Sequence, residues 1–189
     1  MSRKCLAPVE PILINRWSSR AMNGKPLEPG HLAQVLEGAR WSPSGGNKQP
    51  WRFVYALQGS PAFPSLLAAL DEGNRAWCVR AGALFVTCVS VVTSRGTPNR
   101  VAFFEAGLAW MGLSLQASAM GLVSHTMGGF DLDAARLAVG ATPQVEVVVM
   151  GAVGYPGDPA QLAEKDRARE VPSDRNPPSQ WAFEGKLPA

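Results

Sequence analysis

The chain has 189 residues, of which 46% are hydrophobic and 17% are charged. This length suits a single domain, and so apolar a composition excludes a disordered or solvating protein. The formal net charge of +3 comes from basic residues that are scattered rather than gathered in a run with interleaved aromatic residues. We therefore expect one domain spanning 1–189 that binds a small anionic ligand and not nucleic acid.

The cysteines and the N-terminal segment indicate the cellular compartment in which the protein is expected. Cys5, Cys78 and Cys88 are odd in number and widely spaced, so they predict neither a disulfide framework nor a zinc site. Pro8 and Pro11 interrupt the N-terminal segment before the apolar stretch of an export signal can develop. We expect a cytoplasmic protein with no metal site.

In the first half of the chain, the spacing of apolar residues and the positions of proline predict a helix over 11–16 and an amphipathic helix over 29–42. Aromatic and β-branched residues then predict a strand over 51–57. A further helix is expected over 60–70, and Asn74 lies just beyond its end.

In the second half, valine-rich runs at 83–92 and 145–153 predict strands that are covered on both faces. Between them we expect a long apolar helix over 99–122 and a short helix over 131–139, closed by capping residues at both ends. The polar tail ends in a strand-like segment at 180–183, which we expect to extend to a partner subunit. This order predicts an α+β fold with a central sheet flanked by helices.

The uncharged segment 106–123 is long enough to be considered as a membrane span. Polar residues such as Ser114 and Gln116 interrupt it, Glu105 directly precedes it, and the sequence offers no second span or cationic flank. A helix that is apolar on all sides also suits the centre of a protein or a subunit interface. We therefore expect a buried helix at a dimer interface and no membrane association.

Residues 16–20 place two guanidinium groups and two hydroxyl groups close together, just after the first expected helix. Arginine can contact phosphate oxygens in a bidentate manner, and hydroxyl groups can reach the remaining oxygens. A similar cluster is common at solvated helix ends, so this motif alone does not establish a phosphate site.

A second motif is the loop over 42–50, which contains no bulky apolar residue before Trp51. Its glycines expose backbone N–H groups and allow a flat ligand to approach closely. The side-chain amides of Asn47 and Gln49 are suited to the edge of a heterocycle. An ordinary connection of Pro and Gly is the alternative, but it needs neither amide.

Together these motifs resemble the opening signature of the nitroreductase family. The matching residues are Arg16-x-Ser18-x-Arg20 and Pro43-Ser44-x-x-Asn47-x-Gln49-Pro50-Trp51. Later family landmarks agree in order: Asn74-x-x-Trp77, Gly121-Leu122, Met127-Gly128-Gly129-Phe130-Asp131, Gly151-x-x-Gly154-Tyr155-Pro156, and a basic tail with Lys165, Arg167, Arg169, Pro172, Ser173 and Arg175. The resemblance covers nearly the whole chain.

The resemblance implies a homodimer whose two subunits together form each FMN pocket. Arg16, Ser18 and Arg175 are implied to hold the phosphate, and Trp17 either contributes its backbone there or belongs to the core. Arg20 is implied to reach the pyrimidine end of the flavin, where positive charge stabilises the reduced ring. A surface ion pair is the alternative role of Arg20.

The same resemblance implies that Pro43, Ser44, Gly45 and Asn47 border the flavin of the other subunit. Asn74 is implied to bond the pyrimidine edge. A purely structural role in their loops is the alternative for these residues.

Gly128 is implied to direct its backbone N–H at flavin N5, and Gly129 to allow the close approach, although a tight turn would also need glycine.

Trp77 stands where some relatives carry lysine, and we expect it to pack. His125 adjoins this loop, where a proton-donating role is weighed against a structural one. Residues 94–98 form a short segment where many relatives insert a lid.

The implied activity is transfer of hydride from NADH or NADPH, through flavin N5, to a small organic acceptor such as a nitroaromatic or a quinone, in a two-step ping-pong exchange. Because the flavin carries the chemistry, no side chain is assigned as catalytic. The alternatives are oxygen-dependent oxidation or dehalogenation on the same fold, and a flavin-binding protein without catalysis.

Overall fold

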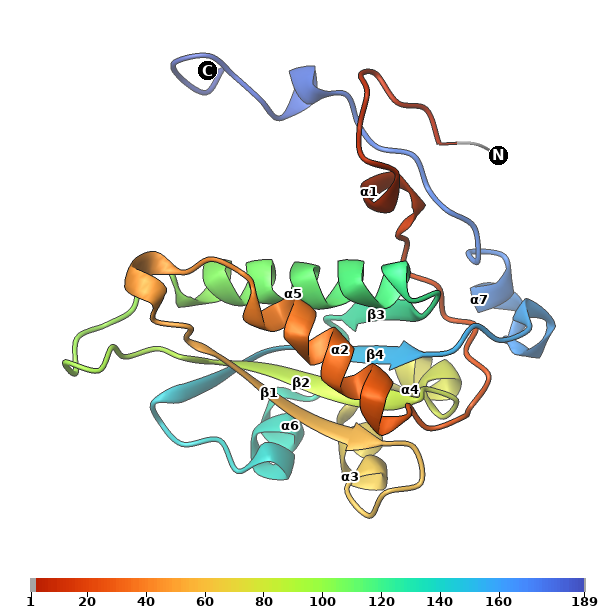
Figure 1. The fold of residues 1–189 in the computed structure, drawn as a ribbon. Helices are drawn as coiled ribbons and strands as arrows, with labels where there is room; N and C mark the ends of the chain where they lie inside the picture. The colour runs from red at the N-terminus through yellow and green to blue at the C-terminus, as the bar shows by residue number, and fades with distance from the viewer. Residues whose placement is uncertain (1–2, 189) are drawn as a thin grey trace.

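The computed structural model describes residues 3–188 and has an α+β fold built on a four-stranded antiparallel sheet (Figure 1). The strands are β1 (Trp51–Leu57), β2 (Ala83–Ser90), β3 (Val123–Met127) and β4 (Val145–Gly154). They lie in the order β1-β2-β4-β3. The expected α+β fold class is confirmed.

The helices are α1 (Pro11–Asn15), α2 (Pro29–Arg40), α3 (Phe63–Ala69), α4 (Glu72–Cys78), α5 (Ala102–Ala119), α6 (Leu132–Val139) and α7 (Glu164–Arg167). Helices α2 and α5 cover one face of the sheet, whereas α3 and α6 cover the other together with the buried end of α4 (Figure 1). The sheet is therefore sandwiched between two helical layers.

The central strand β2 is buried at every position except its last. Phe85 and Val89 pack toward α2 and α5, while Leu84 and Val86 pack toward α3 and α6. Successive side chains of a strand point to opposite faces of the sheet. A strand with apolar residues at consecutive positions can therefore bury all of them only when both faces are covered, as in such a sandwich. The prediction of a strand covered on both faces is confirmed.

Helices α2 and α5 cross closely because glycine occupies the contact on each side. A Cβ atom on Gly38 would lie 2.7 Å from the carbonyl oxygen of Gly112, and one on Gly112 would overlap the carbonyl oxygen of Gly38. This contact fixes one side of α5 and leaves the opposite side outward. Phe103 and Phe104 lie there and are 46% and 69% exposed.

Within a single chain, α5 is therefore buried on one side only. The apolar residues of α5 exceed what the sheet and α2 can cover, and the expected burial of this helix at a dimer interface stays a prediction. None of the helices in residues 3–188 is long and apolar enough to cross a membrane.

Two short helices and one strand were not expected from the sequence: α4, the four-residue α7, and β3. Strand β3 was missed because its central residues are polar, and it forms by pairing with β4 over its whole length. Helix α4 was missed because it has only seven residues, among them Gly73 and Asn74, and depends on Asp71 as its N-cap.

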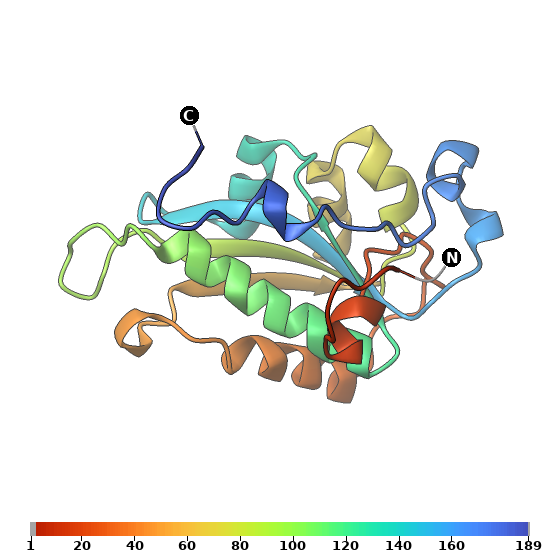
Figure 2. The same ribbon diagram turned by 90° about the horizontal axis from the view of Figure 1, so that it is seen from above.

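The strand expected at 180–183 is not formed within the chain. Residues 178–180 make a single 3-10 turn, and the tail stands clear of the body on the side of α5 (Figures 1 and 2). A strand requires a neighbour with which its backbone can pair, and the sheet of the same chain lies beyond α5. Trp181 and Phe183 remain 64% and 42% exposed.

Candidate active site

Two adjoining cavities lie near the C-terminal end of α5. The first has a volume of about 430 Å³ and is lined by Arg3, Arg16, Trp17, Ser18, Arg20, His125, Arg169, Val171, Ser173 and Arg175. The second, of about 280 Å³, is lined by Arg20, Asp71, Gly73, Asn74, Lys165, Asp166 and Arg169. Because Arg20 and Arg169 line both, the two cavities adjoin each other at these side chains.

The first cavity concentrates positive charge. Five arginines line it, and no carboxylate does so within the described part of the chain. Burial, followed by the nearby guanidinium groups of Arg3 and Arg175, lowers the pKa of Arg16 from its ordinary value. Crowded cations of this kind are stabilised by a bound anion.

The structure thus brings the predicted phosphate contacts Arg16, Ser18 and Arg175 to one cavity, together with Trp17. It adds Arg3, which no sequence motif indicated. Arg3 donates hydrogen bonds to the carbonyl oxygens of Ile14 and Arg16, the latter at 2.8 Å, and so joins the N-terminal segment to the end of α1.

Glu170 connects the two segments that line this cavity. Its carboxylate accepts hydrogen bonds from the backbone N–H groups of Arg20 and Ala21, each at 3.0 Å, and from the Ser19 hydroxyl. These contacts hold residues 16–20 against the tail that carries Arg175. Sequence reasoning missed Glu170 because its partners lie about 150 positions earlier in the chain.

Arg20 lies between the two cavities, where its Nε is 3.9 Å from Oδ1 of Asp166. Both side chains are largely buried, so the exposed ion pair considered as an alternative for Arg20 is not what the structure contains. The second carboxylate oxygen of Asp166 is buried and has no hydrogen-bond partner within residues 3–188. A buried acceptor of this kind suits a ligand that brings its own donor.

Asn74 lines the second cavity from the first turn of α4. Its side-chain amide donates to the carbonyl oxygen of Gly129 at 3.0 Å, while its backbone N–H donates to the capping carboxylate of Asp71 at 2.7 Å. Asn74 is therefore positioned by two contacts from opposite sides, which places α4 against the loop after β3.

The two glycines of that loop differ. Gly128 is exposed at the end of β3, and a Cβ atom there would meet nothing within 4 Å. A Cβ atom on Gly129 would overlap the Asp71 carboxylate and lie 2.8 Å from the Asn74 amide. Neither glycine has a positive φ. The backbone conformation therefore does not itself require glycine at either position, and close contact with Asp71 explains why position 129 needs glycine.

His125 is wedged between Trp77 and the backbone of the 16–20 segment. The ring centroids of His125 and Trp77 are 4.8 Å apart, and Nδ1 of His125 lies 3.3 Å from the carbonyl oxygen of Ser19. Burial, followed by the charge of Arg20, lowers the pKa of His125. Trp77 is 3% exposed and packs, as expected.

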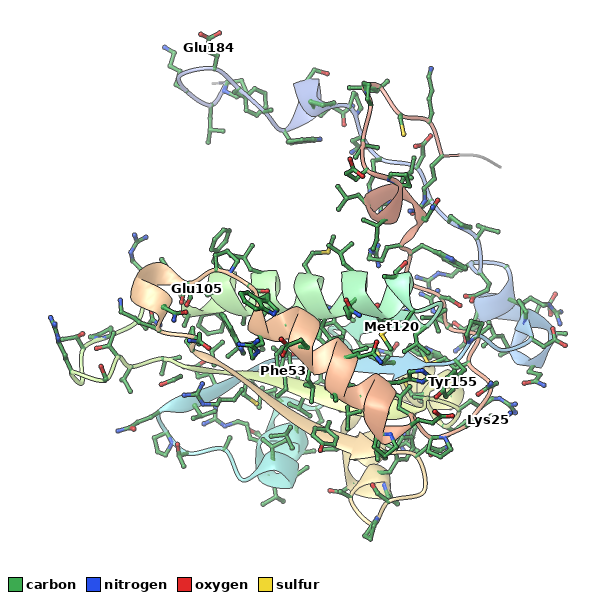
Figure 3. All side chains as sticks on the ribbon, in the orientation of Figure 1. Lys25, Phe53, Glu105, Met120, Tyr155 and Glu184 are labelled. Atoms are coloured by element: carbon green, nitrogen blue, oxygen red, sulfur yellow. The ribbon has the colours of Figure 1, made fainter. Side chains whose placement is uncertain are left out.

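The loop with Pro43, Ser44, Gly45 and Asn47 lies at the opposite end of α5. The backbone N–H of Gly45 donates to Glu105 at 2.6 Å, and Figure 3 shows Glu105 and Met120 at the two ends of this helix. The 18 residues of α5 span roughly 27 Å. Within one chain, the loop residues are therefore separated from the arginine-lined cavity.

The backbone of this loop is unusual. Gly46, Asn47 and Gln49 all have positive φ values, of 60°, 53° and 48°. Two such residues with side chains in one short loop indicate local strain, which the surrounding contacts must maintain. The Gln49 amide, which donates to the side chain and backbone oxygens of Asn47, is one of these contacts.

A model of the Nitroreductase family matches residues 13–76. A solved structure described as an oxidoreductase containing FMN is 36% identical, with a TM-score of 0.94, and the match covers 98% of this chain and 96% of that one. The chain belongs to the nitroreductase family.

Further relatives of this nitroreductase are more distant. A 15.4 kDa protein of Mycolicibacterium smegmatis is 32% identical over 66% of this chain and 83% of its own. A protein of Archaeoglobus fulgidus that carries the provisional name NADH dehydrogenase/NAD(P)H nitroreductase is 23% identical over 82% and 89%. A Desulfovibrio desulfuricans structure in complex with FMN shares the fold, with a TM-score of 0.73 at 22% identity over 96% of this chain and all of that one.

The region matched by the family model contains both opening motifs and Asn74 but ends before β2. Beyond the matched region, His125 and Arg175 line the arginine-lined cavity, whereas Gly128 lines neither of the two cavities. In residues 3–188 there is no group of three or more side chains of His, Cys, Asp or Glu arranged to hold a metal ion.

Proposed function

We propose that this nitroreductase binds FMN and passes electrons from NADH or NADPH to a small organic acceptor. The observation that carries the proposal is the arginine-lined cavity, which adjoins the cavity beside Asn74 at Arg20. An FMN-containing oxidoreductase of 36% identity and relatives with NAD(P)H nitroreductase names support the assignment.

The residues present fit FMN. Arg16, Ser18 and Arg175 would hold the phosphate in the cavity that concentrates positive charge. Arg20 and Asn74 would face the pyrimidine end in the second cavity. The buried oxygen of Asp166 that lacks a partner fits the N–H donor of such a ring.

FMN supplies hydride acceptance and donation at N5 when it is bound, in a two-step exchange between the nicotinamide and an acceptor such as a nitroaromatic or quinone. The protein contributes the positive charge of Arg20, which stabilises a reduced anionic ring. Gly128 offers an exposed backbone at the end of β3, and Gly129 is held behind it by Asn74. His125 has a lowered pKa and is a poor proton donor at neutral pH, so no side chain is assigned as a catalytic acid.

We also propose a two-fold dimer in which Pro43, Ser44, Gly45 and Asn47 border the partner's flavin. The separation of this loop from the cavity of its own chain supports the arrangement, as does the exposed apolar side of α5. The projecting tail with Trp181 offers further apolar surface (Figure 1). Each subunit is one domain, and we place it in the cytoplasm because all three cysteines are free.

The decisive experiment is an absorbance spectrum of the purified protein under nitrogen, before and after addition of NADH or NADPH. We expect a flavin spectrum that is bleached by at least one nicotinamide and restored by a nitroaromatic or quinone. Bound flavin that neither nicotinamide bleaches would instead support a binding protein without this activity. Restoration by oxygen alone would favour an oxidase.

A second measurement tests the phosphate assignment. Arg16→Ala should weaken FMN binding by roughly 1.5–3 kcal/mol, because a charge-assisted contact is lost. Riboflavin affinity should hardly change, since riboflavin has no phosphate. Arg95→Ala, an equal change of charge in an exposed loop at the other end of α5, serves as the control. Equal affinity of the unmodified protein for FMN and riboflavin would contradict the assignment.

A further inference from the structure

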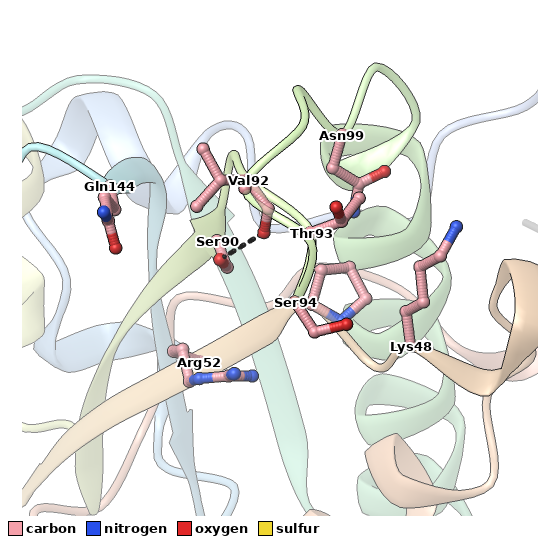
Figure 4. Close-up of a pocket in the computed structure, with 10 residues that line it drawn as sticks. Lys48, Arg52, Ser90, Val92, Thr93, Ser94, Asn99 and Gln144 are labelled. Atoms are coloured by element: carbon pink, nitrogen blue, oxygen red, sulfur yellow. Dashed lines mark hydrogen bonds between the residues drawn. The ribbon is translucent and has the colours of Figure 1, made fainter.

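A third cavity, of about 520 Å³, is lined by residues next to the N-terminal start of α5 (Figure 4), and it shares no lining residue with the arginine-lined cavity of the same chain. Its walls come from the end of the 42–50 loop, strands β1 and β2, the 91–99 connection and the turn before β4. The lining residues are Lys48, Pro50, Arg52, Ser90, Val92, Thr93, Ser94, Gly96, Asn99 and Gln144. Its volume is typical of small-molecule sites.

The charge that lines this cavity is entirely positive. Lys48 and Arg52 are its two charged lining residues, and within residues 3–188 Lys48 forms neither an ion pair nor a side-chain hydrogen bond. Nη1 of Arg52 donates to the carbonyl oxygens of Gln49 and Trp51 at 2.9 and 2.7 Å. These contacts orient the guanidinium group and leave Nε and Nη2 available to a ligand.

No carboxylate of the neighbouring elements lines the cavity in the described part of the chain. Glu105 on α5 accepts a hydrogen bond from Gly45, and Glu146 on β4 does not line the cavity. Arg95 and Arg100, in the connection that forms one wall, add positive charge nearby. The local field therefore favours an anion.

The polar side chains separate into two groups. The Ser90 hydroxyl donates to the carbonyl oxygen of Val92 at 2.8 Å, and the Thr93 hydroxyl pairs with Thr97. Side-chain donors of three other residues make no hydrogen bond within the described chain: Ser94, Asn99 and Gln144. Asn99 is only 7% exposed, so its amide gains most from a ligand.

This set of donors is best matched by a phosphate monoester. A carboxylate presents two oxygens, whereas a phosphate monoester presents three terminal oxygens and up to two negative charges. We propose that the cavity binds the phosphate monoester group of a polar small molecule, with Lys48 and Arg52 as its counter-ions.

Two sources share this chemistry. One is the 2′-phosphate of NADPH, an assignment that rests on the proposed function. The other is a phosphorylated metabolite that binds independently of electron transfer. No aromatic ring lines the cavity in the part of the chain described, so stacking is not expected to contribute.

The test uses the FMN-saturated protein, so that the arginine-lined cavity is occupied, with flavin content read from absorbance. Adenosine 2′-monophosphate and adenosine are titrated separately by calorimetry. We expect saturable binding of the phosphorylated compound, at one molecule per chain, and at least tenfold weaker binding of adenosine.

Lys48→Gln should weaken this binding roughly tenfold, because it removes one charge-assisted contact while keeping a polar side chain. Arg95→Gln removes the same charge without altering the lining and should change the affinity less than about twofold at physiological salt. Arg52→Gln provides a second variant of the lining. Absence of saturable binding, or equal affinity of Lys48→Gln and the unmodified protein, would overturn the proposal.

Steady-state kinetics then identify the source. If adenosine 2′-monophosphate raises the apparent KM for NADPH but not for NADH, and Lys48→Gln abolishes the difference, the site holds the phosphate of the donor. Calorimetric binding without any effect on either KM identifies an independent phosphorylated ligand. Both outcomes support the anion site. A protein that lacks FMN reduction would refute the proposed function while the titration still reports on this cavity.

Discussion

The two ends of helix α5 are built on different principles. Near Met120, residues 16–20 and the basic tail of the same chain close around an arginine-lined cavity and are joined by Glu170. Near Ala102, the glycine-rich loop is anchored by Glu105 but has no part in that cavity. One chain thus assembles the arginine-lined cavity by itself, whereas in the proposed dimer its loop motif would border the flavin of the partner subunit.

The difference shows in how each end is stabilised. The first end relies on hydrogen bonds between segments distant in sequence, which fix the geometry before any ligand binds. The second end holds Asn47 and Gln49 in left-handed conformations on an exposed loop. Strain of that kind persists where function depends on the conformation, so the comparison can be tested at both ends.

The largest effect is expected when the outward side of α5 is made charged. Phe104→Glu should shift the proposed dimer toward monomer by about 100-fold or more, because association would bury an unpaired carboxylate. The monomer should also lose most of its FMN, since the loop can no longer reach the partner's site. Light scattering and flavin absorbance measure the two quantities.

Leu137→Glu on α6 is the matched control, because Leu137 is 85% exposed on the opposite layer. It should remain a flavin-loaded dimer. A monomeric Phe104→Glu protein with stoichiometric FMN would show that one chain completes the site.

The next largest effect concerns the contact between the two segments at the phosphate end. Glu170→Ala should lower the free energy of unfolding by roughly 2–4 kcal/mol, because three donors lose their charged acceptor. FMN affinity should fall as well, since residues 16–20 are no longer held near Arg175. Denaturant unfolding and flavin titration check both effects, with Glu184→Ala in the exposed tail as the control. Unchanged FMN affinity in a folded Glu170→Ala protein would refute the positioning role.

A smaller and more local difference is expected between the adjacent glycines. Gly129→Ala should destabilise the protein by about 1–3 kcal/mol, because the new Cβ atom displaces Asp71 from the cap of α4. Gly128→Ala should change stability by less than about 0.5 kcal/mol, since nothing lies within 4 Å of its Cβ position. Thermal unfolding distinguishes them. Equal effects at both positions would contradict the contact with Asp71.

The smallest effect concerns His125. Its pKa is lowered below the ordinary value of 6.5, so the unfolded chain binds a proton that the folded chain resists. Stability should therefore decrease as the pH falls from 6.5 toward the lowered pKa and then become constant. Unfolding of His125→Gln between pH 7.5 and 5.5 should lack this contribution. An identical pH dependence in both proteins would show that His125 does not titrate in this range.

Elements whose signals are local were predictable from neighbouring residues alone. Helix α6 runs from Asp131 as N-cap to Gly140 in a left-handed conformation, as its capping residues indicate. Strand β1 was predicted at its exact bounds, and the valine-rich runs of β2 and β4 marked the strands at the centre of the sheet. The two opening motifs identified the family, because close spacing of donors is visible in the chain itself.

Only the tertiary structure decided which of those residues share a cavity. Arg16 meets Arg3 and Arg175, and Glu170 meets Arg20, through contacts between segments far apart in the sequence. The strand expected at 180–183 did not form because pairing depends on a neighbouring strand and not on the composition of the segment. The propensity of a segment to form a helix or strand depends on neighbouring residues. Cavities and strand pairs depend instead on contacts between segments that are distant in the sequence, so they form only when the chain packs.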